Sequence, residues 1–406
     1  MQRLRFALSI VAVLSGLCVS SAIAADADWP TFRGPNGEGK SPDTGLLKEW
    51  PADGPKQLWK VDGIGTGFSS VAVSGGTVYA SGHVDGKLML FAFDMDGKLK
   101  WKVEVCKAFG GGPKGTRATP TVDGGKVYLL SGAGRMSVFE AATGKELWSK
   151  EARDFGGRPG GWGYAESVLI YKNLAIFKPG GKNCIVALNK ATGETVWTSK
   201  GITAGPEYGS CLRFTWAKAA WIATGTRRGL VCVSAATGEV KWTNPWSSGN
   251  TANCPTPVIG DGHVFWANGY GRGGVCMKLG EGGEATEAWT TKNLICHHGG
   301  YIFHEGYLYG NHGGGWSCLD IKTGEKKWNA RGVGKGSVVW ADGMLYLFSE
   351  GGGQAALATC SPDGLEIKGK VKVAGRGPSW AHPAVIGGRL YLRYDDNLYC
   401  FDVKAK

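Results

Sequence analysis

The stretches AATGKELW (141–148), KATGETVW (190–197), AATGEVKW (235–242) and IKTGEKKW (321–328) are copies of one unit, in which a glycine precedes a tryptophan by four residues. A shorter copy, DMDGKLKW, occupies residues 94–101. A tight hairpin turn needs a residue at positive φ, and glycine enters that region without a steric penalty. The strand after the turn then carries its tryptophan on one face. Each copy therefore predicts a β-hairpin that ends in a tryptophan-bearing strand.

Three more strands complete a repeat of roughly 45 residues. A short strand such as LMLFAFD (88–94) lies before the turn, and a strand such as KVYLL (126–130) lies before that. A turn rich in Asp and Gly and an opening strand, such as TRATPTV (116–122), begin the unit. Four short strands joined by tight turns are typical of one propeller blade.

The tryptophan position gives the number of blades. It recurs at Trp59, Trp101, Trp148, Trp197, Trp242, Trp289 and Trp328. The same spacing from Gly364 places an eighth position at Lys368, where the aromatic is missing. The first position has no preceding strands, and the chain ends (379–404) with three strands that lack a fourth. We therefore expect an all-β fold, an eight-bladed β-propeller of four-stranded antiparallel blades, in which the N-terminal strand around Trp59 completes the last blade and leaves no open edge. Seven blades are the alternative.

The N-terminus predicts export. Arg3 and Arg5 precede an apolar run (6–19) and a small-residue site ending at Ala24, so residues 1–24 are expected to be a signal peptide cleaved after Ala24, with a periplasmic or secreted product. The run is too short to span a bilayer comfortably and no later stretch is longer, so no transmembrane segment is expected. Residues 25–55 form a Gly- and Pro-rich lead-in, either ordered along the ring or a flexible tether, and residues 56–406 form one propeller domain.

The net charge of the chain indicates which kind of partner to expect. The chain has a formal net charge of +12, which falls to +10 without the two arginines of the signal peptide. A basic exported surface favours anionic neighbours such as an anionic polysaccharide or an envelope protein. Lys and Arg are dispersed along the chain, which argues against nucleic acid as a partner. We expect a monomer.

The repeats resemble those of pyrroloquinoline-quinone (PQQ)-dependent dehydrogenases and of the outer-membrane barrel-assembly propeller lipoprotein, with the shared pattern L-Y-A-L-D-A-x-T-G-x-x-x-W. The resemblance covers residues 57–403, and the lead-in DWPTFRGPNGEGKSP (28–42) looks like the start of secreted quinoprotein-like propellers. It implies the blade architecture and leaves the chemistry open. The catalytic relatives hold the quinone over the ring axis between a Trp and a disulfide of two adjacent cysteines, beside a calcium ion. This chain has no adjacent cysteine pair. No cofactor is therefore predicted, and PQQ with calcium is kept as the alternative.

Polar and aromatic side chains gather in the segments that lead into the innermost strands, which surround the axis of a propeller. Aromatic stacking and charge could there bind a sugar, a quinone or a peptide loop. The candidate ligand-binding residues of this axial funnel are Arg117, Trp162, Tyr164, Glu166, Tyr208, Arg213, Asn253, His297, His298, Lys335, Trp380 and His382. The alternative is that the walls are polar only because the channel is wet.

Histidines, a glutamate and cysteines are the candidates for metal binding, acid–base chemistry and disulfide bonds. Adjacent residues on a strand point to opposite faces, so only one of His297 and His298 is expected to face the channel, and no metal site is predicted. Glu166 is the expected buried carboxylate, and one carboxylate makes no acid–base pair. Equivalent positions in successive blades lie too far apart for a disulfide. The cysteines in the small-residue position of the blade are therefore expected to be buried, unpaired thiols: Cys232, Cys276, Cys318 and Cys400.

The sequence thus favours an exported, non-catalytic propeller that serves as a binding or assembly scaffold at the cell envelope. One alternative is a PQQ-dependent oxidoreductase acting on alcohols or sugars. The other is a carbohydrate-binding or carbohydrate-active propeller, for which the aromatic residues of the funnel are the only indication.

Overall fold

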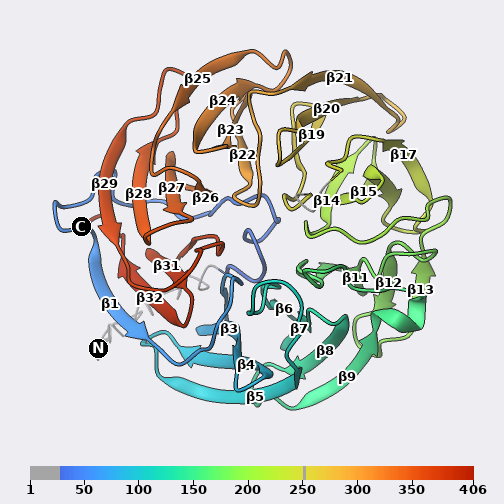
Figure 1. Cartoon of the computed structure of the whole chain (residues 1–406), viewed down its shortest axis with the longest axis horizontal. Coiled ribbons are helices and arrows are strands. Elements are labelled where there is room, and N and C mark those ends of the chain that lie inside the picture. The colour runs from blue at the N-terminus through green and yellow to red at the C-terminus, as the bar shows by residue number, and fades with distance from the viewer. Residues whose placement is uncertain (1–27, 250–252) are drawn as a thin grey trace, which may run out of the picture.

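The computed structural model describes residues 28–249 and 253–406, and in them eight four-stranded antiparallel sheets surround a central axis (Figure 1). The predicted eight-bladed propeller is confirmed and the seven-bladed alternative is wrong. The predicted signal peptide lies outside the described residues. Within the described part of the chain, no helix is long and apolar enough to cross a membrane.

Blades 1 to 4 follow the chain, each built from four consecutive strands. They comprise β2 (Ala72–Ser74), β3 (Thr77–Val84), β4 (Lys87–Asp94) and β5 (Leu99–Lys107); β6 (Thr121–Asp123), β7 (Lys126–Leu130), β8 (Arg135–Glu140) and β9 (Glu146–Glu151); β10 (Leu169–Tyr171), β11 (Leu174–Phe177), β12 (Val186–Asn189) and β13 (Thr195–Thr198); and β14 (Leu212–Trp216), β15 (Ala219–Thr226), β16 (Gly229–Ser234) and β17 (Val240–Asn244). A short 3-10 helix, η1 (Ala152–Phe155), follows β9.

Blades 5 to 7 repeat this order, and blade 8 takes one strand from the N-terminus. They comprise β18 (Val258–Gly260), β19 (His263–Asn268), β20 (Gly273–Leu279) and β21 (Ala285–Thr291); β22 (Tyr301–His304), β23 (Tyr307–His312), β24 (Gly315–Asp320) and β25 (Lys326–Ala330); β26 (Gly336–Ala341), β27 (Met344–Ser349), β28 (Gln354–Thr359) and β29 (Ile367–Lys372); and β30 (Ala384–Ile386), β31 (Arg389–Tyr394), β32 (Asn397–Asp402) and β1 (Lys56–Val61).

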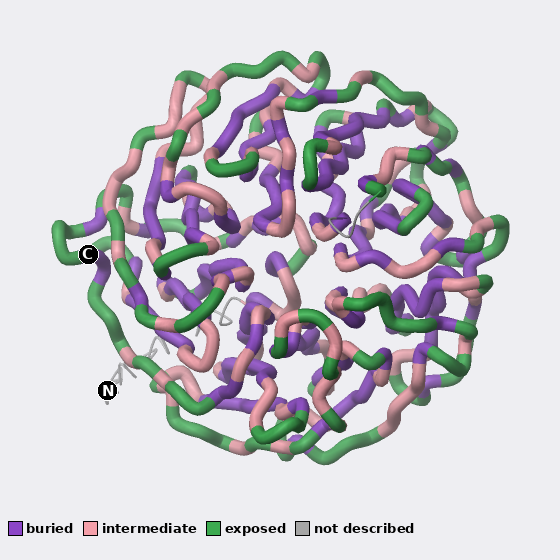
Figure 2. Tube along the Cα trace, viewed as in Figure 1, coloured by how far each residue is buried: buried purple, intermediate pink, exposed green. Residues whose placement is uncertain are grey.

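The ring closes as the sequence predicts. Strand β1 pairs antiparallel with β32, with Trp59 opposite Cys400. Blade 8 therefore has four strands, although its outermost strand comes from the other end of the chain (Figure 1). The middle strands of every blade are almost wholly buried and the outer strands are largely exposed (Figure 2), because neighbouring blades pack on both faces of each sheet.

The repeated tryptophan joins each blade to the next. A β-bulge just before the tryptophan turns the preceding residue outward, as at Val196 before Trp197. The tryptophan then lies over the turn glycine of the next blade: a Cβ on Gly193, at φ +76°, would lie 2.8 Å from the Trp148 ring. In several blades the indole also donates to a backbone carbonyl of the next blade, as Trp101 Nε1 does to Ala141 O at 3.1 Å. The glycine is thus required both for its turn and for this contact.

The small-residue position lies opposite the tryptophan on the neighbouring strand. Cys232, Cys276 and Cys318 pair in register with Trp242, Trp289 and Trp328, as Cys400 does with Trp59. All four cysteines are buried and none forms a disulfide. The prediction of buried thiols filling this position is confirmed.

The missing tryptophan of blade 7 is supplied from elsewhere in the chain. The predicted position, Lys368, is off by one residue, because the residue in register with Leu357 is Gly369. Trp50 of the lead-in packs over Gly369, so closely that a Cβ there would lie 2.4 Å from the Cβ of Trp50. Its ring lies 6.0 Å from that of Tyr346, much as Trp101 lies 5.9 Å from Tyr79 in blade 1. The described lead-in therefore completes the seventh blade.

The lead-in also reaches the axis of the ring. Trp29 is fully buried and exchanges backbone hydrogen bonds with Val73 of blade 1. The chain then runs to the centre and back out toward blades 7 and 8 (Figure 1). At the centre, the buried Arg33 guanidinium donates to Tyr301 O at 2.6 Å. Of the two expectations for the lead-in, the described residues 28–55 fit the ordered one.

A belt of hydroxyl groups holds the inner ends of the first five blades together. Thr119, Ser167, Ser210 and Thr256 each occupy the position two residues before an innermost strand, and each hydroxyl accepts a hydrogen bond from the backbone N–H at the same position of the preceding blade, at 2.9–3.2 Å. In blade 8 the same position holds His382, whose carbonyl accepts from the Ser70 hydroxyl at 2.7 Å. Of the residues at these positions, Ser167 and His382 reach the wall of the axial cavity.

Candidate functional site

A cavity of about 130 Å³ lies at the axis, where the segments before the innermost strands converge. It is lined by Phe32, Phe68, Arg117, Trp162, Ala165, Ser167, Tyr208, Cys254, Tyr270, His297, His298, Trp380 and His382. A second cavity, of about 170 Å³, lies between the lead-in and blades 2 to 5, and Phe32 and Ser167 line both. Phe32 of the lead-in therefore stands between the two cavities.

Aromatic rings form much of the wall of the axial cavity. Trp380 is central, with its ring 4.4 Å from Phe68, 6.2 Å from Trp162 and 5.7 Å from His298. Tyr270, which is 61% exposed, lies at the edge and contacts His297. Flat apolar faces of this kind suit a ligand that contains a ring.

Arg117 is the cation of this wall. Its guanidinium donates to the carbonyls of Gly115 and Pro113 and lies over the Phe68 ring, 5.6 Å from the centroid. None of the residues that line the axial cavity, in the described part of the chain, is Asp or Glu. Burial lowers the pKa of Arg117, which remains a cation at neutral pH. The wall thus presents a positive charge that no lining carboxylate neutralises.

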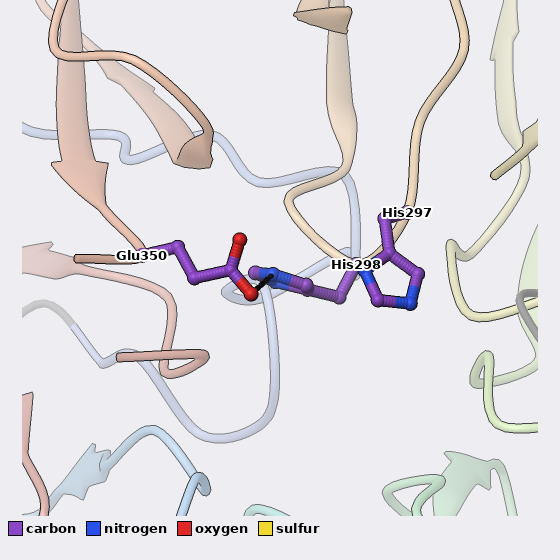
Figure 3. A group of neighbouring side chains, drawn as sticks. All are labelled: His297, His298 and Glu350. Atoms are coloured by element: carbon purple, nitrogen blue, oxygen red, sulfur yellow. Dashed lines mark ion pairs between the residues drawn. The ribbon is translucent and has the colours of Figure 1, made fainter. Parts of the chain in front are cut away.

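Beside the cavity, Glu350 connects three elements. It follows β27, and it accepts from the Trp380 indole N–H at 2.7 Å and from Lys335 Nζ at 2.8 Å. Its other carboxylate contact is His298 Nε2, at 3.4 Å. Lys335 Nζ also lies 2.8 Å from His297 Nδ1. Figure 3 shows the Glu350 carboxylate and the His298 ring pointing toward one another, with His297 beyond.

Burial and these contacts determine whether Glu350 and the three histidines of the site are charged. Burial alone would raise the pKa of Glu350, but its contacts with His298 and Lys335 lower it well below the usual value, so it is a carboxylate. Burial lowers the pKa of His297 to about 4 and that of His382 to about 3, and nearby positive groups add to both shifts. Burial also lowers the pKa of His298. The histidines are therefore neutral at pH 7.

The structure brings most of the sequence-predicted site residues together. Seven line the axial cavity: Arg117, Trp162, Tyr208, His297, His298, Trp380 and His382. An eighth, Lys335, lies just behind through its contacts with His297 and Glu350. The expectation that only one of His297 and His298 faces the channel is wrong. Both line the cavity, because they lie in a bend before β22 and the alternation of a strand does not apply to them.

Four predicted residues lie outside the cavity. Tyr164 is buried and donates to Pro179 O at 2.7 Å. Glu166 is buried as expected, with Lys178 Nζ 4.0 Å away, and its pKa is raised to about 7 by burial. Asn253 is bonded to Ser248. Arg213 lies on β14 beside the second cavity, with its guanidinium over the Tyr171 ring.

Sequence reasoning missed several members of the wall. Phe32 lies in the lead-in, outside the repeats, whereas Phe68 stands before β2 as Arg117 stands before β6, so the position of Phe68 in its repeat could have revealed it. Tyr270 and Glu350 follow second strands and so lie outside the segments that lead into the innermost strands. The signal that was overlooked is the glycine-rich loop SEGGG (349–353), where a single carboxylate stands among residues without side-chain chemistry.

The cavity does not fit PQQ with calcium as the resemblance describes it. Trp162 and Trp380 offer ring faces, but the described lining residues supply no carboxylate or amide oxygen for calcium. Beside the cavity Glu350 offers a single carboxylate, whereas calcium takes about six to eight oxygen ligands. Cys254, the cysteine in the lining, has no neighbouring cysteine in the sequence with which to form the pair.

Comparisons with known proteins agree with this architecture. A tetrathionate hydrolase of Acidithiobacillus ferrooxidans is 24% identical over 312 residues, which are 73% of this chain and 52% of that protein. A crystal structure of quinohemoprotein alcohol dehydrogenase from Comamonas testosteroni superposes with a TM-score of 0.71, at 14% identity, over 94% of this chain and 81% of that one. That likeness concerns the fold alone.

A further relative and a family model carry the same name. Outer membrane protein assembly factor BamB of Bordetella pertussis is 29% identical over 187 residues, 45% of this chain and 43% of the relative. The chain thus matches about half the length of these curated relatives. The family described as outer membrane protein assembly factor BamB matches residues 45–182 and 163–330, well over half of the chain. This propeller therefore belongs to the outer membrane protein assembly factor BamB family.

Proposed function

We propose that this chain is an exported binding and assembly platform of the cell envelope, and that its axial cavity holds an acidic, ring-containing group of the partner. The observation that carries the proposal is the cavity wall, which combines several aromatic faces with the Arg117 cation and has no Asp or Glu among its described lining residues. Aromatic faces stack on sugar rings, and a guanidinium binds carboxylates in a bidentate manner. An anionic envelope polysaccharide built from acidic sugars has both features.

Family membership supports the scaffold part of the proposal. The relative from Bordetella pertussis is named as an outer membrane protein assembly factor. The basic composition supports an anionic partner, because a formal net charge of +12, or +10 without Arg3 and Arg5 of the predicted signal peptide, attracts acidic surfaces. The predicted signal peptide supports the periplasm or the cell exterior as the location.

Binding of acidic and neutral oligosaccharides tests this function. Galacturonate or glucuronate oligomers, and neutral oligomers of equal length, are titrated into the purified protein by calorimetry at two salt concentrations. We expect the acidic oligomers to bind, more weakly at high salt, and the neutral ones to bind at least about tenfold more weakly, because a charge-assisted hydrogen bond contributes about 1.5–3 kcal/mol.

Two arginine variants make the test specific. Arg117→Gln should weaken binding of the acidic oligomers about tenfold or more. The matched control is Arg213→Gln, since Arg213 is an arginine on an aromatic ring outside the axial cavity. Equal binding of neutral and acidic oligomers, or equal loss in both variants, would refute the proposal. Turnover of an alcohol or sugar after addition of PQQ and calcium would establish the oxidoreductase in its place.

A further inference from the structure

Three metal-ligating side chains meet beside the axial cavity. One ligand atom each from His297, His298 and Glu350 lie within 4.8 Å of one another (Figure 3). The two histidines come from the bend before β22 and the glutamate from the loop after β27, so blades 6 and 7 both contribute. Two imidazoles and one carboxylate form a donor set that binds zinc and related divalent transition metals.

Neighbouring residues hold Glu350 and His298 in place through hydrogen bonds, as happens around the ligands of many metal sites. Trp380 donates its indole N–H to the Glu350 carboxylate at 2.7 Å. His382 Nε2 lies 3.0 Å from the backbone carbonyl of His298 and fixes the bend. The His298 side chain is only 11% exposed; its Nδ1 has no hydrogen-bond partner, and its Nε2 faces Glu350 Oε1 at 3.4 Å. A buried imidazole and a carboxylate at this separation have unused ligand capacity.

A positive charge already stands among the same atoms. Lys335 Nζ lies 2.8 Å from both His297 Nδ1 and Glu350 Oε2. His297 Nδ1 and Glu350 Oε2 thus already bind one cation, the Lys335 ammonium. Because the Lys335 side chain is 32% exposed, it can move away into solvent. A metal ion in its place would replace a single charge by a double one.

We propose that His297, His298 and Glu350 form a binding site for a divalent transition metal such as Zn²⁺, which displaces the Lys335 ammonium. Tetrahedral ligands about 2.0–2.1 Å from zinc lie about 3.4 Å apart. His298 Nε2 and Glu350 Oε1 already have that separation, at 3.4 Å. Since the three ligand atoms lie within 4.8 Å of one another, His297 has to approach by up to about 1.4 Å, by rotation of its side chain once Lys335 has left. The fourth position is open for an oxygen of a ligand. The site goes beyond the proposed function and stands without it.

Zinc binding to the full chain, with any histidine tag removed, tests the site directly. Calorimetry with zinc chloride should give one zinc per chain for the wild type. His298→Ala should weaken binding about 100-fold, because two ligands remain. Lys335→Met should tighten it about tenfold or more, because it removes a competing positive charge at close range. Circular dichroism establishes that each variant is folded.

A second histidine beside a glutamate serves as the matched control. His304 lies 4.0 Å from Glu305 outside the cavity, so His304→Ala should leave the affinity unchanged. Cobalt(II) should give the intense visible bands of a four-coordinate site in the wild type and lose them in His298→Ala. The proposal is overturned if the wild type binds no stoichiometric zinc or if His298→Ala binds as the wild type does. It is equally overturned by a cobalt thiolate charge-transfer band, which would place the metal on the cysteines.

Discussion

Replacing Trp50 by alanine would remove the aromatic that the lead-in contributes to blade 7. Trp50 is 4% exposed, lies against Tyr346 and Gly369, and donates its backbone N–H to Lys368 O at 2.8 Å. Substituting a buried tryptophan by alanine costs about 3–5 kcal/mol through lost burial and the cavity that remains. We take the lower end, about 3 kcal/mol, because a segment at the edge of the ring relaxes into part of the space.

The assay is urea denaturation followed by far-UV circular dichroism, with free-energy differences taken from the shift in midpoint at a common slope. Trp101→Ala, in the equivalent position of blade 1, should cost about 2–3 kcal/mol. Leu99→Ala is the control on the same strand, since Leu99 is 45% exposed and should change stability by less than about 0.5 kcal/mol. Trp50→Phe should cost only about 1 kcal/mol, because the Trp50 indole N–H has no hydrogen-bond partner to lose.

One result would refute this reasoning. If Trp50→Ala unfolds within about 0.5 kcal/mol of the wild type while Trp101→Ala shows its full loss, the lead-in contributes nothing to blade 7 and behaves as a tether. A loss in Trp50→Ala alone, with Trp101→Ala unchanged, would instead refute the equivalence of the two positions.

Three further predictions concern the closure of the ring by β1, a turn glycine and the pH dependence of stability. A chain that begins at Gly63 lacks β1 and should lose cooperative urea unfolding; a sharp transition at the wild-type midpoint would contradict the role of β1 in closing the ring. Gly238→Ala should cost about 2 kcal/mol or more in the same assay, because φ is +74° and the new Cβ would lie 2.4 Å from the Trp197 ring, whereas Gly364→Ala meets nothing within 4 Å and should be neutral. Burial raises the pKa of Glu207 from 4.5 to about 7, so the folded state holds its proton more tightly, and the stability that this provides is lost as pH rises from about 4.5 to 7. Glu207→Gln should therefore match the wild type at pH 4 and exceed its stability at pH 8 by up to about 3 kcal/mol; a difference that does not grow with pH would contradict this.

The fold was predictable because its determinants are local. The glycine, the bulge and the tryptophan of each repeat lie within a few residues, and the tryptophan contacts the corresponding turn of the next copy. Blade 7 departs from this rule: the spacing from Gly364 to its slot, Gly369, is five residues, and the aromatic comes from Trp50. No local pattern connects Trp50 with that slot, so the sequence showed the gap without showing what fills it.

The site was predictable only in part, for a physical reason. Counting strands brings the segments before the innermost strands to the axis, and seven of the predicted residues do line the cavity. Side-chain direction in a bend cannot be read from alternation, so the strand rule failed for His297 and His298. Partners such as Phe32 and Glu350 reach the cavity through the lead-in and a loop, whose paths depend on tertiary packing.

The departures from the repeat are informative because a ring built only for packing would use the same residue in every inner position. Blades 2 to 5 carry a belt hydroxyl there, as Thr119 does, whereas blade 6 has Gly299 and blade 8 has His382. These exceptions are unfavourable locally: His382 Nδ1 is buried without a hydrogen-bond partner. Local rules are broken in this way mainly where a structure serves a purpose other than its own stability. Both exceptions adjoin His298, which faces Glu350, so that part of the ring is where ligand and metal binding should be sought first.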